Sequence, residues 1–319
     1  MESSEPSPDL STRARLATLG TGAAWLLGLA ALLQVIAVVI GGSPPAEAAV
    51  GALVVDVAAG RAGILWATDA AARPLLVRRV LVASGMAAAV VLVTLVIAGV
   101  QGWVRTEPGH IDGLFLLAIG TTVGVSIRDE LLLRAVPIHF AKKAGIGNQA
   151  AIAFAAALSP TPFLLEGAPA ASVVLAVATG FLFASLYVYA GGAWAAIAAR
   201  CTWSLAVGPF SHGGVADVRW RRGELMEGSN AAGPPAFMAA LVAVALALLV
   251  LPRLERLLVG PAQPEPAPTP PGEDEEPEAG KDEAEEDEED EAAEDDADEP
   301  SKAADATDAE SEERDERKP

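Results

Sequence analysis

Residues 113–137 read GLFLLAIGTTVGVSIRDELLLRAVP, an apolar run that ends in four ionisable residues. About 20 mainly apolar residues are enough for a helix to cross the hydrocarbon core of a bilayer, so this run predicts a membrane-spanning helix. Glu130 and Arg134 lie one helical turn apart, and we expect them to pair. Asp129 is rotated by about 100° from Glu130 and can face a cavity or a neighbouring helix. Pro137 is expected to kink or end the helix.

The composition of the whole chain indicates the same class of protein. Of its 319 residues, 52% are hydrophobic and 20% are charged, and the mean hydropathy is +0.36. This excludes an ordinary soluble enzyme. The net charge of −20 belongs to the end of the chain, because residues 260–319 hold 27 of the 42 acidic residues and 5 of the 22 basic ones. The rest of the chain is nearly neutral and offers no electrostatic surface for nucleic acid.

Further apolar runs of spanning length predict an all-α fold, a polytopic membrane helix bundle. Besides 113–136, they cover 18–41, 80–101, 147–165, 171–190, 193–210 and 234–252. An eighth stretch at 49–68 is long enough but carries Asp56 and Arg61, which are costly near the bilayer centre. Counting it gives about eight transmembrane helices.

Basic residues near the ends of these runs predict the orientation. Four groups of basic residues lie on the same side of the membrane only if 49–68 crosses it. The positive-inside rule then makes that side cytoplasmic. These groups are Arg13 with Arg15, Arg73 with Arg78 and Arg79, Lys142 with Lys143, and Arg253 with Arg256. Both termini are then cytoplasmic. A fifth group, Arg219, Arg221 and Arg222, would be external and violates the rule.

Three regions follow from these patterns: a cytoplasmic segment at 1–17, a transmembrane domain at 18–259 and a tail at 260–319. The first apolar run exceeds the 7–15 residues of a signal-peptide core, so we expect an uncleaved helix. The tail is rich in proline and then in acidic residues, a composition that predicts disorder. It can act as a solvating appendage or capture a basic partner or divalent cations.

Few residues are suited to bind a metal or a cofactor. Cys201 is the single cysteine, which excludes an intrachain disulfide and a zinc site of paired cysteines. The three histidines, His110, His139 and His212, share no helical spacing. We therefore expect no metal, no cofactor and no nucleic acid, and the lipid bilayer as the main partner.

A second intramembrane charge, Arg200, lies within an apolar run. The run opens with Gly191-Gly192-Ala193-Trp194, which places Arg200 about 10–12 Å along a helix at 1.5 Å per residue. A buried arginine needs a counter-charge. Asp129 or Glu130 is the expected partner.

These residues resemble the CPBP family (CAAX protease and bacteriocin-processing, or Abi) of intramembrane endopeptidases. Its first motif is two adjacent glutamates, three further residues and an arginine, and it is matched by Asp129, Glu130 and Arg134. The likeness covers roughly residues 110–250, including the segment Glu227-Gly228-Ser229-Asn230 before the last apolar run.

The second and third motifs of the family are degenerate in this chain. Phe-x-x-x-His aligns with Phe154 and Leu158. His-x-x-x-Asn, on a helix opened by a Gly-Gly-x-Trp-like stretch, aligns with Arg200 and Ser204.

The resemblance implies roles that these substitutions weaken. In active relatives the first carboxylate and the second-motif histidine activate a water, and the third-motif residues stabilise the oxyanion. Here Asp129 keeps a carboxylate, but Leu158 cannot transfer a proton. Arg200 and Ser204 remain hydrogen-bond donors of a different kind. Losing a general base costs about 10²–10⁴ in rate, and losing one oxyanion donor costs about 10²–10³.

The sequence therefore predicts a CPBP-like membrane protein with reduced or lost proteolytic activity, whose polar intramembrane site binds a membrane-associated peptide or helix. Two alternatives remain open. One is an active, divergent endopeptidase that uses Asp129 and Glu130. The other is a non-enzymatic scaffold or a transporter-like protein.

Overall fold

A computed structural model describes residues 11–64, 66, 73–165, 167–225, 227, 229–251 and 253. These residues are predominantly helical, as predicted. The expectations for the acidic tail at 260–319 lie outside the described residues. The elements, in chain order, are α1 (Thr12–Ile40), α2 (Pro44–Arg61), α3 (Arg73–Val100), β1 (Val104–Pro108), α4 (Gly113–Glu130), the π-helix η2 (Leu131–Ala135), α5 (Val136–Lys143), α6 (Asn148–Leu158), α7 (Thr161–Leu165), α8 (Ala170–Tyr189), α9 (Ala193–Val207), β2 (Ala216–Trp220) and α10 (Pro234–Leu249).

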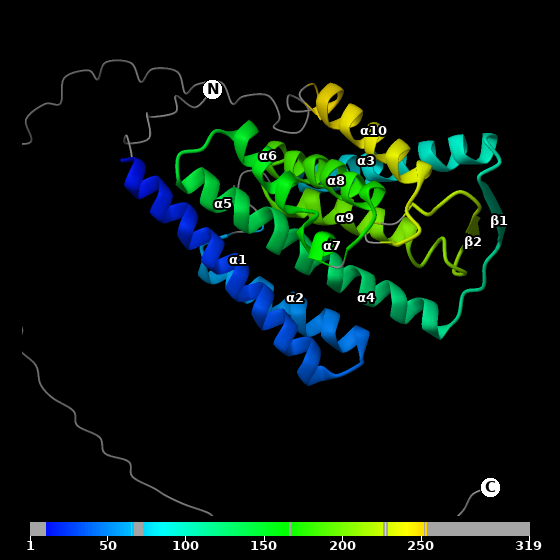
Figure 1. Cartoon of the computed structure of the whole chain (residues 1–319), viewed down its shortest axis with the longest axis horizontal. Helices are drawn as coiled ribbons and strands as arrows, with labels where there is room; N and C mark the ends of the chain where they lie inside the picture. Colours follow the sequence, from blue (N-terminus) through cyan, green and yellow to red (C-terminus); the bar gives the residue numbers. More distant parts are fainter. Residues whose placement is uncertain are drawn as a thin grey trace, which may run out of the picture. The chain divides into compact units, whose positions relative to one another are not determined.

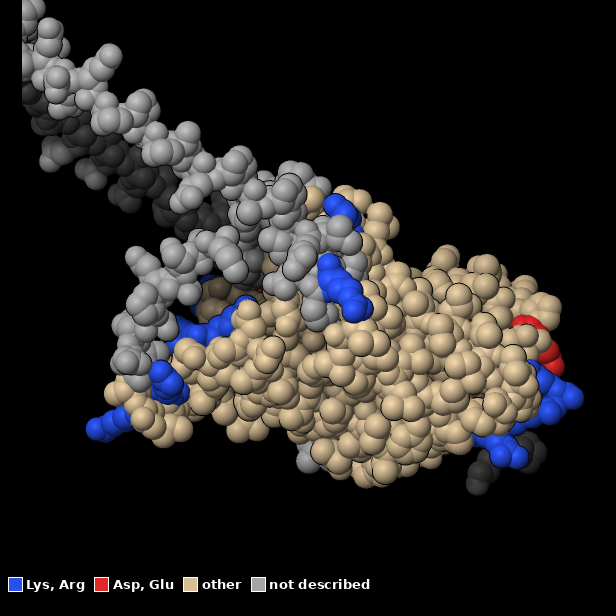
Figure 2. Space-filling view, turned by 90° about the horizontal axis from the view of Figure 1, so that it is seen from above, with Lys and Arg blue, Asp and Glu red and all other residues tan. Residues whose placement is uncertain are grey.

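Three helices are long and apolar enough to cross a membrane. They cover Thr12–Ile40, Leu75–Val100 and Ala170–Tyr189, and α9 and α10 are shorter apolar helices. The eight predicted spans are therefore found only in part among the described residues. Figure 2 shows a broad area, between basic side chains that lie mainly toward the two ends, that carries neither acidic nor basic side chains. A surface without charges is the kind that a lipid environment favours.

The predicted span at 147–165 is not one helix. It is divided into α6 and the short α7, and the break lies at Ser159 and Pro160. Pro160 and Pro162 account for the break, because proline lacks the backbone N–H that a continuous helix needs.

Of the two effects expected of Pro137, an end of the helix is not found, because the chain stays helical to Lys143 through η2 and α5. In η2 the N–H of Val136 donates to the carbonyl of Leu131, five residues earlier. Such π-bulges are one of the recognised causes of an irregular helix. The irregularity therefore precedes the proline and lies directly after Glu130.

Two short strands were not predicted, so the fold is not purely α-helical. β1 pairs antiparallel with β2, with Val104 opposite Trp220 and Pro108 opposite Ala216. Figure 1 shows the pair at the right-hand end of the helices, away from α5. The guanidinium of Arg219 lies 3.0 Å from Glu107 and 2.9 Å from Asp217. Arg219 belongs to the group that violates the positive-inside rule, and these carboxylates balance its charge.

Two groups of buried apolar side chains hold the helices together. One joins α3, α8, α9 and α10, and the other joins α1, α2, α5, α6, α8, α9 and the π-helix. α8 and α9 contribute to both groups, and Figure 1 shows them among the other helices. Many members of both groups are alanines, whose small side chains allow close helix packing. The positions of α4, α8 and α9 fix the site described next.

Candidate functional site: an acid–arginine cluster

Six ionisable side chains come together where α4, the π-helix and α9 meet the segment that precedes α10. We call them the acid–arginine cluster. Its members are Arg128, Asp129, Glu130, Arg134, Arg200 and Glu227.

The outer part of the cluster lies at the end of α4. Two nitrogens of Arg128, Nε and Nη2, each lie 2.9 Å from Oδ1 of Asp129. A third nitrogen, Nη1, lies 4.0 Å from Glu47 of α2. Gly51 allows this arrangement, because a Cβ there would lie 3.1 Å from Cδ of Arg128. Arg128 thus connects α2 with the predicted catalytic carboxylate.

The inner part is the pair that the helical spacing predicts. Nη1 of Arg134 lies 3.6 Å from Oε2 of Glu130, and both side chains are fully buried. In the described part of the chain neither carboxylate oxygen of Glu130 has a hydrogen-bond partner. The guanidinium carbon of Arg134 lies 5.8 Å from the ring centre of Phe183 on α8, a cation–π distance. Glu130 and Arg134 therefore balance each other's charge inside the protein.

Arg200 contacts the predicted acid and another that was not predicted. Its Nη2 lies 3.9 Å from Oδ2 of Asp129, so the expected ion pair is present. Its Nη1 donates a shorter hydrogen bond, 2.6 Å, to Oε2 of Glu227. The guanidinium carbon also lies 5.8 Å from the ring centre of Phe183. Glu227 is thus the main partner of Arg200.

Glu227 completes the cluster from outside the regular helices. Its Oε1 accepts a 2.5 Å hydrogen bond from the hydroxyl of Thr179 on α8, and its side chain is only 6% exposed. Helical periodicity carries no information on such a residue, because it lies in a turn. The signal available in the sequence was charge, because the three arginines of this region outnumber Asp129 and Glu130.

Leu158 and Ser204, the other two degenerate motif positions, are not members of the cluster. Ser204 is half-buried on α9, one turn beyond Arg200, and Leu158 is the half-buried last residue of α6. Neither side chain can form an ion pair. The cluster therefore brings together the first-motif residues and Arg200, with Arg128 and Glu227 as additional members.

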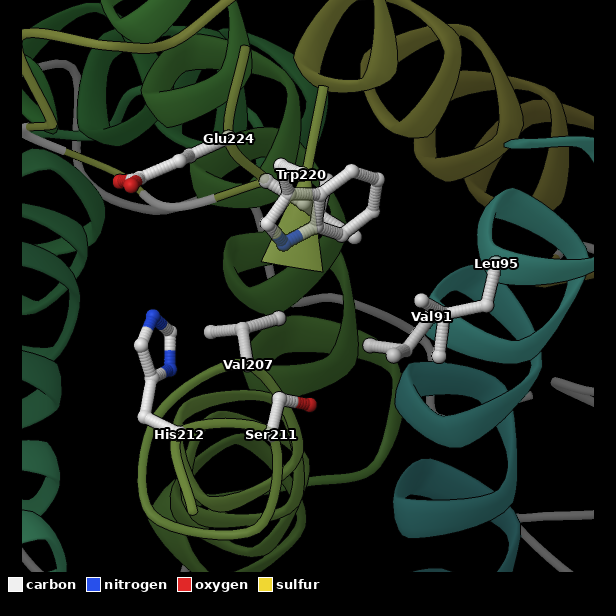
Figure 3. Close-up of a pocket in the computed structure, with 8 residues that line it drawn as sticks. Val91, Leu95, Val207, Ser211, His212, Trp220 and Glu224 are labelled. Carbon is white, nitrogen blue, oxygen red and sulfur yellow. The ribbon is translucent and has the colours of Figure 1, made fainter. Parts of the chain in front are cut away.

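Among the described residues, His139 and His212 form their contacts outside the cluster. His139 lies on α5 and packs edge-on against Phe140, with ring centres 5.4 Å apart. Nδ1 of His212 lies 3.0 Å from the carbonyl of Gly208. His212 lines a separate pocket with Glu224, Trp220 and others, and in Figure 3 the hydroxyl of Ser211 points away from it. Among the described residues no group of three or more histidine, cysteine or acidic side chains could hold a metal.

The chemistry of the cluster is that of a balanced set of fixed charges. It contains three guanidinium groups and three carboxylates. One oxygen of Asp129 lies beside Arg128 and the other beside Arg200. Both oxygens therefore face a guanidinium group, an arrangement suited to the pairing of charged groups.

Comparison of the chain with protein families, curated proteins and solved structures gives no match.

Proposed function

We propose that the chain is a multi-pass membrane protein of the CPBP-like type that has lost peptide hydrolysis and uses its acid–arginine cluster to bind a membrane-associated peptide or helix. The single observation that carries this proposal is the double engagement of Asp129 by Arg128 and Arg200. The residue that would activate water acts as a counter-ion. Leu158, at the position of the second-motif histidine, cannot take over its role.

The membrane part of the proposal is supported by helix length and by the pairing of the two strands. β1 lies between α3 and α4, and β2 between α9 and α10. The strands can pair on one side of a bilayer only if an even number of crossings separates them. Of the elements between the strands, α8 is long and apolar enough to cross a membrane, and α9 is a shorter apolar helix. The proposed topology has four crossings here, by α4, the broken apolar stretch at 147–165, α8 and α9, and this even number is compatible with the strand pairing.

A second candidate function, an active intramembrane endopeptidase, is favoured by one observation. Glu130 is fully buried, and both of its carboxylate oxygens lack a hydrogen-bond partner within the described residues. A buried carboxylate of this kind could act as a base if water reached it. The endopeptidase would cleave peptides and would need the carboxylates of Asp129 and Glu130 to do so, whereas the binding protein would not cleave them.

The experiment compares the purified protein, reconstituted in liposomes, with an Asp129→Asn, Glu130→Gln double variant on a library of apolar peptides. We expect no cleavage product that depends on the two carboxylates. Photo-crosslinking should show that the wild type retains apolar peptides and that the double variant, whose cluster is altered, retains fewer of them. Products formed by the wild type and lost in the double variant would overturn the proposal and establish the endopeptidase.

A further inference from the structure

The carboxylate of Glu227 occupies a site built by two helices. It receives one hydrogen bond from Arg200 of α9 and one from Thr179 of α8. A guanidinium combined with a hydroxyl is a common means of binding a carboxylate, because the charged hydrogen bond is strong and directional. The helices thus form a carboxylate site, and Glu227 occupies it.

The segment that carries Glu227 is closed by its own contacts. The N–H of Glu224 donates to the carbonyl of Ala231 over 2.7 Å, and the hydroxyl of Ser229 donates to Glu224 over 2.6 Å. Glu224 also forms a β-bridge with Ala232. In the sequence, Glu227 lies between Glu224 and Ser229, two of the residues that close the segment. Its side chain can therefore leave Arg200 while the base of the segment remains intact.

The charge of Arg200 favours an anion at this position. Without Glu227, Arg200 faces only Asp129 at 3.9 Å, and Arg128 engages the same carboxylate at 2.9 Å. An uncompensated charge in an apolar helix bundle is strongly unfavourable. A carboxylate from another molecule would restore the balance that Glu227 provides.

The surroundings indicate what such a carboxylate would be attached to. The ring of Phe183 lies under the guanidinium of Arg200, and the buried side chains of Phe183, Trp203 and Leu182 belong to one apolar group. A ligand that approaches between these helices must itself be largely apolar.

We propose that Arg200 and Thr179 form a binding site for a carboxylate carried on an apolar chain, with Glu227 as an internal competitor that such a ligand displaces. This rests on the proposed function, because it names the ligand class of the same cluster. A free fatty acid and the carboxyl end of an apolar peptide share this chemistry.

The test measures binding of octanoate to the full-length protein in detergent, with octanol as the uncharged probe. If Glu227 occupies the site about nine-tenths of the time, Glu227→Ala should bind octanoate about tenfold more tightly than the wild type. Glu227→Gln, which keeps the size of the side chain, should show the same direction. Glu224→Gln is the matched control in the same segment and should bind as the wild type does. Adding Thr179→Val to Glu227→Ala should remove the gain.

If Glu227→Ala is too unstable for a binding measurement, the effect of the ligand on its thermal unfolding provides the test instead. Octanoate should then restore the transition temperature of that variant, whereas octanol should not. An apolar tripeptide with a free carboxyl end, with its amide as the uncharged probe, identifies the source of the carboxylate. Tighter binding of the tripeptide acid than of octanoate indicates a peptide, and tighter binding of octanoate indicates a fatty acid. Equal octanoate binding by all variants, or equal effects of octanoate and octanol, would overturn the inference. The cleavage assay above is independent, so failure of the proposed function would be seen separately.

Discussion

At the scale of single residues, charge balance accounts for most of the cluster. Glu130 faces Arg134 at i and i+4, and the sequence spacing was sufficient to predict that pair. The need of Arg200 for a counter-charge suggested Asp129 or Glu130 as its partner, and the ion pair with Asp129 is present. The sequence spacing did not suggest Arg128 as a competitor for Asp129, since neighbouring positions on a helix are not expected to face each other. Long arginine side chains can nevertheless fold back, and Arg128 does so.

The buried pair of Glu130 and Arg134 leads to a prediction about stability. Arg134→Ala should lower the free energy of unfolding by about 3–5 kcal/mol, because it leaves a buried carboxylate without a counter-charge. Unfolding in detergent can be followed by circular dichroism. Arg219→Ala is the control, since Arg219 is 64% exposed and its ion pairs should contribute little. If the two variants lost equal stability, Glu130 and Arg134 would not form a mutually dependent pair.

At the scale of elements, the apolar runs predicted most of the helices but not their interruptions. The single run at 147–165 joined α6 to α7, although Pro160 and Pro162 marked the break. The π-helix was not predicted either, because its cause is a local shift in hydrogen bonding that composition does not reveal. β1 and β2 are only five residues each. Such short strands depend on the partner that the fold brings to them, which a single sequence does not show.

The packing of α1 on α5 gives a prediction at this scale. A Cβ at Gly22 would lie 2.8 Å from Cβ of Phe140, whereas a Cβ at Gly28 of the same helix meets nothing within 4 Å. Gly22→Ala should therefore destabilise the protein by about 1–3 kcal/mol, the usual cost of overpacking. Gly28→Ala should be neutral or slightly stabilising, because alanine favours the helix. Thermal unfolding of the two variants, measured side by side, checks both expectations. Similar shifts in both would mean that α1 does not pack on α5 as described.

At the scale of the whole molecule, the membrane topology can be tested through the strand pair. Cysteines at Thr106 and Val215, in a Cys201→Ser background, should react with a membrane-impermeant maleimide applied to intact cells. Cysteines at Ser3 and Ser301 should not react until the cells are opened. This follows from an even number of crossings between β1 and β2 and from cytoplasmic basic loops. Labelling at only one of the two positions, Thr106 in β1 or Val215 just before β2, would contradict the crossing count.

The central claim is that the carboxylates around Arg200 act as counter-ions, and a double-mutant cycle on the full chain tests it most directly. The variants are Arg200→Ala, Glu227→Gln, Asp129→Asn and the two double variants that combine Arg200→Ala with each acid substitution. Residues in contact couple by about 0.5–3 kcal/mol. We predict a coupling in this range for Arg200 with Glu227, whose atoms are 2.6 Å apart, and a smaller one for Arg200 with Asp129 at 3.9 Å. Strictly additive losses in both cycles would contradict the claim.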